Sequence, residues 1–98
     1  MKVVFTDEAL RDLDQILEFN RAHYPSSVDA VQRRLRATEQ RIGTWPKSGP
    51  EVEQRPGVRV VFLTPYPFKL FYRIATERIE ILHVTHAARQ DPWDREAL

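Results

Sequence analysis

The sequence has 98 residues, the length of a single domain, which we place over residues 1–98. Its 15 lysines and arginines against 14 aspartates and glutamates leave a net charge of +1, whereas proteins that bind phosphate backbones usually carry a clear basic excess. It contains no cysteine, which excludes a disulfide framework and thiolate chemistry. No apolar run approaches the roughly 20 residues of a membrane span. We therefore expect a cytoplasmic protein that does not associate with a membrane.

The N-terminal part predicts a strand followed by a helix. Residues 2–5, KVVF, have the composition of a short strand. Thr6 stands where a helix N-cap is expected, before an acidic first turn. An amphipathic helix is predicted from residue 7 to about residue 23, and Pro25 ends it. Its buried stripe is predicted to consist of Leu10, Leu13, Leu17 and Tyr24.

A second apolar stripe predicts a helix that is capped by Ser26 or Ser27 and runs to about Gly43. Because the turn between the helices is short, we expect them to be antiparallel neighbours. The next stretch, residues 43–57, contains all three glycines and three of the seven prolines. This composition predicts a long loop, in which we expect Trp45 to pack against the helix end.

Three apolar segments then predict strands, at residues 58–63, 68–74 and 79–85. On the last strand, regular alternation places His83 with Ile79 and Ile81, on the face opposite to Val84. The element order is therefore β-α-α-β-β-β. We predict an α+β fold with an antiparallel sheet and the helical hairpin packed on one face.

The last two predicted strands carry large apolar residues on both faces. Alternation places Lys69, Phe71 and Arg73 on one face of the first of them. A single helical pair covers only one face of a sheet, so the face with Phe71 needs another cover. We expect a partner protein there, because an apolar surface with a charged rim usually marks a binding site. The alternative is that the loop 43–57 and the segment after His86 fold over it.

Few residues suggest catalysis. His83 and His86 point to opposite faces of a regular strand and cannot bind one metal ion together. No serine stands in a nucleophile elbow, and there is no glycine-rich phosphate loop. We therefore expect no metal and no cofactor.

One set of side chains could still act on a phosphate group: Arg59, Lys69, Arg73, His86 and Arg89. Cations of this kind can stabilise the charge that develops during attack on a phosphate, and His86 could exchange a proton. The other interpretation is that these charges surround the partner site. The weak net charge favours this second interpretation.

Two stretches near the C-terminus, YPFKLFYRI (66–74) and RIEILHVTHAARQDPW (78–93), resemble the last strands of the RelE/ParE superfamily of bacterial toxins. The stretch TDEALRDLDQILEFN (6–20) is similar to the first helix of that family. The resemblance implies a toxin of a type II toxin-antitoxin system, kept inactive by a cognate antitoxin. RelE-like members cut messenger RNA on the ribosome, whereas ParE-like members inhibit DNA gyrase.

The resemblance also bears on the choice between these activities. Lys69 matches a basic strand position of the nucleases and Arg89 matches their arginine after the last strand, but no tyrosine follows Tyr72. The expected C-terminal proton-transfer residue is replaced by the segment Asp91–Trp93. This favours a ParE-like gyrase inhibitor that is not an enzyme. The alternative is a metal-independent, ribosome-dependent endoribonuclease that uses Lys69, Arg73, His86 and Arg89.

For partners, the resemblance implies a ParD-like antitoxin in a heterotetramer or larger complex, with DNA bound only through the antitoxin. We predict that the antitoxin covers the Phe71 face and the helical pair, with carboxylates near the cations, and contacts Arg59, Lys69, Phe71 and Arg73. Arg89 and Trp93 are the candidates for binding the target, on a C-terminal segment expected to be uncovered. A third interpretation is an orphan binding module without toxicity. A neighbouring gene for a ribbon-helix-helix protein would favour the toxin.

Overall fold

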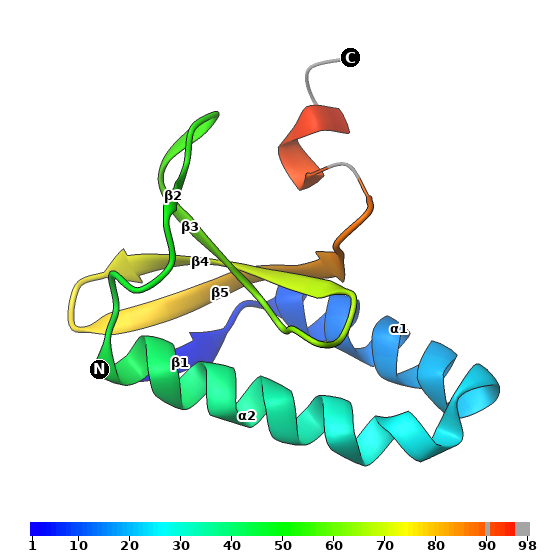
Figure 1. Cartoon of the computed structure of the whole chain (residues 1–98). Helices are drawn as coiled ribbons and strands as arrows, with labels where there is room; N and C mark the ends of the chain where they lie inside the picture. Colours follow the sequence, from blue (N-terminus) through cyan, green and yellow to red (C-terminus); the bar gives the residue numbers. More distant parts are fainter. Residues whose placement is uncertain (90, 96–98) are drawn as a thin grey trace.

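The computed structural model describes the backbone of residues 1–89 and 91–95, and the side chains of residues 1–89 and 91–93. Its elements are β1 (Lys2–Phe5), α1 (Asp7–His23), η1 (Pro25–Ser27), α2 (Val28–Thr44), β2 (Glu51–Val52), β3 (Arg55–Phe62), β4 (Phe68–Ala75), β5 (Arg78–His86) and η2 (Pro92–Arg95). Both long helices lie on one face of the sheet, which we call the inner face (Figure 1). The other face, toward η2, is the outer face. The predicted α+β fold, with a helical hairpin on one face, is confirmed.

The sheet has the strand order β1-β5-β4-β3-β2. The pairs β2–β3, β3–β4 and β4–β5 are antiparallel. The prediction of an antiparallel sheet is wrong at one edge, because β1 pairs in parallel with β5, with Val3 opposite Ile79. The two strands lie at opposite ends of the sequence, and no tight turn joins them. Only tertiary packing therefore sets their relative direction.

The start of α1 agrees with the prediction, and the start of α2 does not. The Thr6 hydroxyl accepts a hydrogen bond from the Ala9 amide at 3.2 Å, which caps α1. Tyr24 leaves the helix with φ −140°. The Ser27 hydroxyl donates to the Tyr24 carbonyl at 2.7 Å and makes no cap bond to α2. The predicted serine cap is therefore wrong, because the 3₁₀ turn η1 uses the hydroxyl instead.

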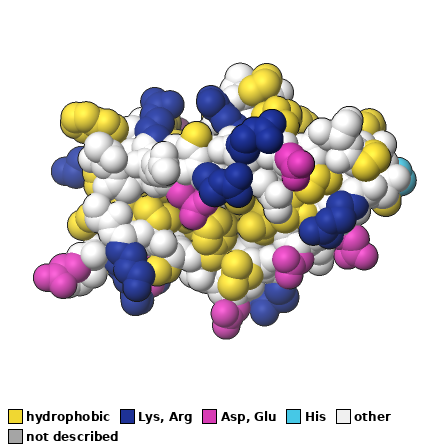
Figure 2. Space-filling model, turned by 90° about the horizontal axis from the view of Figure 1, so that it is seen from below, with side chains coloured by type: hydrophobic (Ala, Val, Ile, Leu, Met, Phe, Trp, Pro, Cys, Tyr) yellow, Lys and Arg dark blue, Asp and Glu magenta, His cyan; other side chains and the backbone are white. Residues whose placement is uncertain are grey.

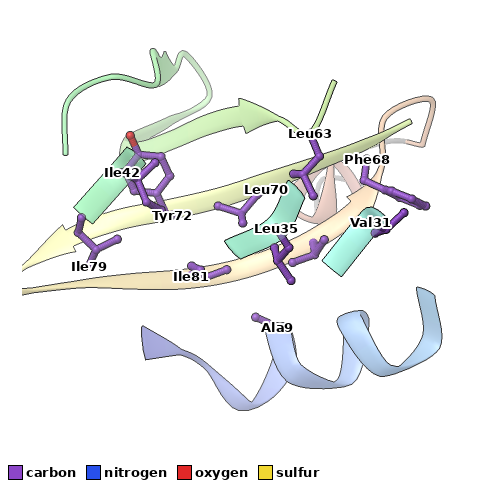
Figure 3. Close-up of a cluster of buried hydrophobic side chains, with 11 residues drawn as sticks. Ala9, Val31, Leu35, Ile42, Leu63, Phe68, Leu70, Tyr72, Ile79 and Ile81 are labelled. Atoms are coloured by element: carbon purple, nitrogen blue, oxygen red, sulfur yellow. The ribbon is translucent and has the colours of Figure 1, made fainter. Parts of the chain in front are cut away.

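The inner face of the sheet packs against the helices around a single cluster of buried side chains (Figure 3). β4 contributes side chains at every second position, as the alternation predicts. The cluster consists of Ala9, Val31, Leu35, Ile42, Leu63, Phe68, Leu70, Tyr72, Ile79, Ile81 and Val84. This core fixes which side of β4 faces outward.

The predicted alternation on β5 is wrong beyond Ile81, because the strand contains a bulge. Leu82 is unpaired between Ile81 and His83, which pair with consecutive residues of β4. The extra residue turns Val84 into the inner core. The Asp12 carboxylate of α1 accepts a hydrogen bond from the Val84 amide at 3.1 Å and lies 3.3 Å from the His83 ring nitrogen Nδ1. The bulge thus joins α1 to the strand.

The stretch predicted as a loop over residues 43–57 contains more regular structure than expected. Its first two residues belong to α2, and later residues form β2 and the start of β3. Trp45 is 68% exposed, so its predicted role as a packing anchor is wrong. Tyr72 is the anchor instead: its hydroxyl donates to the Pro46 carbonyl at 2.7 Å and accepts from the Gly49 amide at 3.1 Å. A β-carbon at Gly49 would lie 2.6 Å from a backbone oxygen, so only glycine fits there.

We expect Tyr72→Phe to lower the free energy of unfolding by about 1–3 kcal/mol, because it leaves a buried amide and a carbonyl without a partner. Urea unfolding followed by circular dichroism measures the change. Tyr66→Phe is the matched control, since the Tyr66 side chain is only partly buried and its hydroxyl has no hydrogen bond within the described residues; it should cost less than about 0.5 kcal/mol. Equal losses in both variants would contradict the anchoring role.

Candidate functional site

The outer face of β4 is covered by the chain itself. Phe71 is only 1% exposed and packs in a second cluster with Val52 of β2 and Trp93 of η2. The Trp93 ring meets the Phe71 ring edge-on, with centroids 4.7 Å apart. The expectation that this face is bare is therefore wrong. The alternative, in which the 43–57 stretch and the C-terminal segment fold over it, is confirmed.

Lys69 is buried beneath the same C-terminal segment. It is 8% exposed, and its ammonium group lies 2.6 Å from the Asp91 carboxylate. The ammonium also donates to the Arg89 carbonyl at 3.2 Å and lies 5.5 Å from the centre of the Phe71 ring. A carboxylate, a carbonyl and an aromatic face thus already surround this cation.

Arg73 shares its partner, Glu80, with Arg78. Each arginine donates to a different oxygen of the Glu80 carboxylate, both at 2.7 Å. The pKa of Glu80 lies below its ordinary value, because the hydrogen bond from Arg73 stabilises the charged form; burial acts in the opposite direction, and the bond from Arg78 adds to the lowering. The Glu80 side chain is 11% exposed while both arginines are about half exposed. The two cations therefore lie between the Glu80 carboxylate and the solvent.

Arg59 stabilises the segment that precedes β2. Its guanidinium donates to the Gly49 carbonyl at 2.7 Å and to the Lys47 carbonyl at 3.4 Å. Three cations that we predicted to meet antitoxin carboxylates are thus bonded within the chain, and the predicted apolar contact, Phe71, is buried. Their roles in antitoxin binding remain predictions.

His86 does not lie with Lys69. It pairs with Phe68 across β4 and β5, and the two rings meet edge-on at 5.9 Å. Phe68 belongs to the inner core, and directly opposite residues share a face. His86 therefore sits on the inner side of the sheet, and its Nδ1 accepts from the Ala88 amide at 3.2 Å. Among the predicted nuclease residues, the structure therefore places Lys69 and His86 on opposite faces of the sheet, while the Arg89 backbone bonds to both of them.

Sequence reasoning missed a polar cluster between α1 and β5. His83 lies between two carboxylates, with Nδ1 3.3 Å from Asp12 and Nε2 3.5 Å from Glu8. The sequence patterns of α1 and β5 did not predict this cluster, because its contacts depend on the bulge in β5. Within the described part of the chain, no group of three or more acidic or histidine side chains could hold a metal ion. No helix there is long and apolar enough to cross a membrane.

The helical side exposes apolar side chains that were predicted to be buried. Leu17 is buried as expected, but Leu10 and Tyr24 are exposed. Phe19 is exposed as well, and its ring lies 4.3 Å from that of His23. Figure 2 shows hydrophobic surface in the middle of this side, surrounded by charged side chains of both signs. This is the apolar surface that the described residues leave uncovered on the helical side.

The chain matches one protein family in sequence and is similar to solved structures in fold. A family model described as the ParE toxin of type II toxin-antitoxin system, parDE, matches residues 3–91. A solved structure titled as the chromosomal ParDE TA system from P. aeruginosa is similar, with TM-score 0.75 and 24% identity over 88% of this chain and 95% of that one. The isolated E. coli RelE toxin has TM-score 0.55 and 14% identity over 98% and 94%. At these identities both structures show a shared fold. No curated protein sequence matched.

We expect that in Glu80→Gln the free energy of unfolding decreases less as the pH is lowered. Because the folded pKa is lowered, the carboxylate stabilises the fold above its unfolded-state pKa of about 4, and this contribution is lost as the pH falls through the lower folded pKa. Urea unfolding at several values between about pH 5 and pH 3 measures it. Glu53→Gln, at an exposed position, is the control and should follow the parent protein. An unchanged acid slope in Glu80→Gln would contradict the assignment.

Proposed function

The chain belongs to the ParE toxin family of type II toxin-antitoxin systems, and on this premise we propose that it inhibits DNA gyrase. The family match and the fold shared with a ParDE system identify a toxin that has an antitoxin as its partner. The resemblance implies gyrase as the target of ParE-like members. The proposal treats the protein as a binding inhibitor without catalysis of its own.

The observation that carries this choice is that Lys69 and His86 lie on opposite faces of the sheet. Cleavage of a phosphodiester needs a proton-transfer group beside the cations that stabilise the phosphate. Lys69 is bonded to Asp91 on the outer face, while His86 packs against Phe68 on the inner side. Arg73 is bonded to Glu80. This arrangement favours gyrase inhibition over cleavage of messenger RNA.

We place the antitoxin on the helical side. Figure 2 shows hydrophobic surface in the middle of this side, with charged side chains around it, and an apolar patch with a charged rim is typical of a protein contact. The antitoxin would be ParD-like, in a heterotetramer or larger complex, and would carry any contact with DNA. A wrapping segment should bury more than the roughly 1,600 Å² of a standard interface.

The target surface includes Arg89 in this proposal. Arg89 is exposed just after β5, whereas Trp93, our other candidate, is 9% exposed and packs on Phe71. In the described arrangement the Trp93 ring therefore belongs to the outer cluster. Arg89 can meet a carboxylate or phosphate group of the target from the surface.

We expect the purified protein to inhibit plasmid supercoiling by DNA gyrase without cutting RNA. Arg89→Glu should weaken the inhibition by about tenfold, because a reversed surface charge repels the target. His86→Ala should leave inhibition within about twofold, since the proposal gives this exposed side chain no part in binding gyrase. A supercoiling assay on agarose gels measures both, and stability is checked by thermal unfolding.

An experiment in translating cells could contradict this proposal. Messenger RNA cleavage at codon-phased positions soon after induction, with plasmid supercoiling unchanged, would contradict gyrase inhibition and identify the nuclease. In that case His86→Ala, Lys69→Ala and Arg89→Ala would each abolish cleavage. Absence of both effects in a folded protein would indicate the orphan binding module.

A further inference from the structure

We propose that Lys69 is a positioning residue for target binding, which fixes the backbone at Arg89 so that the Arg89 guanidinium meets the target in one orientation. This inference rests on the proposed function, in which Arg89 contacts gyrase, and deepens it. Lys69 does not touch the target in this arrangement, because its side chain is buried. It acts through Arg89.

The ammonium group of Lys69 joins β4 to the segment that follows β5. It donates to the Arg89 carbonyl at 3.2 Å and to the Asp91 carboxylate at 2.6 Å. β4 lies between β3 and β5 in the sheet, so this support comes from a rigid part of the fold. Groups that a strand holds are placed more precisely than groups that only a loop holds.

Further hydrogen bonds hold the backbone between β5 and Arg89. The Ala87 amide donates to the Pro67 carbonyl at 2.8 Å. The Ala88 amide donates to His86 Nδ1 at 3.2 Å, and the Arg89 amide donates to the His86 carbonyl at 3.1 Å. Both backbone polar groups of Arg89 are therefore bonded, the amide to β5 and the carbonyl to β4.

The side chain of Arg89, in contrast, is not used by the fold. It is exposed, and its guanidinium has no hydrogen bond and no ion pair within the described residues. A fixed backbone with an unused guanidinium is the arrangement expected of a preorganised contact. Fixing the backbone beforehand reduces the conformational entropy that is lost when the guanidinium pairs with the target.

The charge of Lys69 is not needed to fill the space between the strand and the segment. The residue is 8% exposed, and lysine is seldom buried unless its charge is paired. Methionine has a similar length and buries the same stem without a partner. A buried ion pair usually adds little stability compared with apolar side chains of similar size. The ammonium group therefore matters for what it holds, the backbone at Arg89.

A double-mutant cycle on gyrase inhibition tests this role. Lys69→Met removes the ammonium group, and we expect the concentration for half-maximal inhibition of plasmid supercoiling to rise about threefold to tenfold, because the guanidinium is no longer preorganised. In a chain that already carries Arg89→Ala, the same change should raise this concentration less than about twofold. Equal effects in both backgrounds would overturn the proposal, because Lys69 would then act independently of Arg89.

Trypsin cleavage after Arg89 gives a readout that does not depend on gyrase. Trypsin cuts the peptide bond after an arginine, and Lys69 holds the carbonyl of this bond. In Lys69→Met we expect this cleavage, followed by mass spectrometry, to become about threefold to tenfold faster, because the segment opens more often. An unchanged rate would contradict the positioning role. Lys2→Met, the same change at an exposed lysine, is the matched control and should change neither cleavage nor inhibition.

Thermal unfolding shows whether Lys69→Met folds. If it does not, Asp91→Ala replaces it in both assays, since it removes the carboxylate from the ammonium group and leaves β4 unchanged; the same pattern is expected. If the parent protein does not inhibit gyrase, the proposed function fails, and the cleavage rates still decide whether Lys69 holds Arg89. If the parent inhibits gyrase and Lys69→Met inhibits equally well, the positioning role fails and the proposed function stands.

Discussion

A strand that is apolar on both faces must be covered on both, and β4 is such a strand. Its first five residues, Phe68–Tyr72, are all buried. Alternate side chains enter the inner core under the helices, and Phe71 enters the outer cluster with Val52 and Trp93 (Figures 1 and 3). Because burial of each large side chain is worth about 1.5–3 kcal/mol, both covers contribute to folding. The course of the chain after β5 follows from this requirement.

The edge of the sheet depends on a second constraint, the need to pair backbone groups. β1 ends at Phe5, and beyond it the Thr6 amide makes one more backbone bond to β5, donating to the Ile81 carbonyl at 3.0 Å. There the Thr6 hydroxyl donates to the Ile81 carbonyl at 2.9 Å, and the Asp12 carboxylate accepts from the Val84 amide. Side chains of α1 and its cap thus take the place of a neighbouring strand. They also fix the position of α1, and hence of the apolar surface on the helical side.

The predicted site cations of the sheet are largely used within the fold. Lys69 meets Asp91, Arg73 meets Glu80, and Arg59 meets backbone carbonyls. Cations that are already paired are poorly placed to bind a phosphate in a reaction.

Sequence alone determined the elements that depend on local patterns. The boundaries of α1 followed from the Thr6 cap and from Pro25, and the hairpin of β4 and β5 followed from two apolar segments with a short polar connection. The resemblance carried by the last two strands identified the toxin superfamily, which the family match confirms. These features require only residues that are close in the sequence, or a motif that can be read along it.

Tertiary structure alone decided the features that depend on distant contacts. The bulge at Leu82 moves Val84 to the inner face, and it is held by Asp12, some 70 residues away. The pairing of Lys69 with Asp91 and the burial of Trp93 depend on where the chain goes after the sheet ends. Alternation along a strand states which residues share a face, but it does not state what lies above that face. For this reason the sequence showed that the outer face needs a cover, and only the fold showed that the chain supplies it.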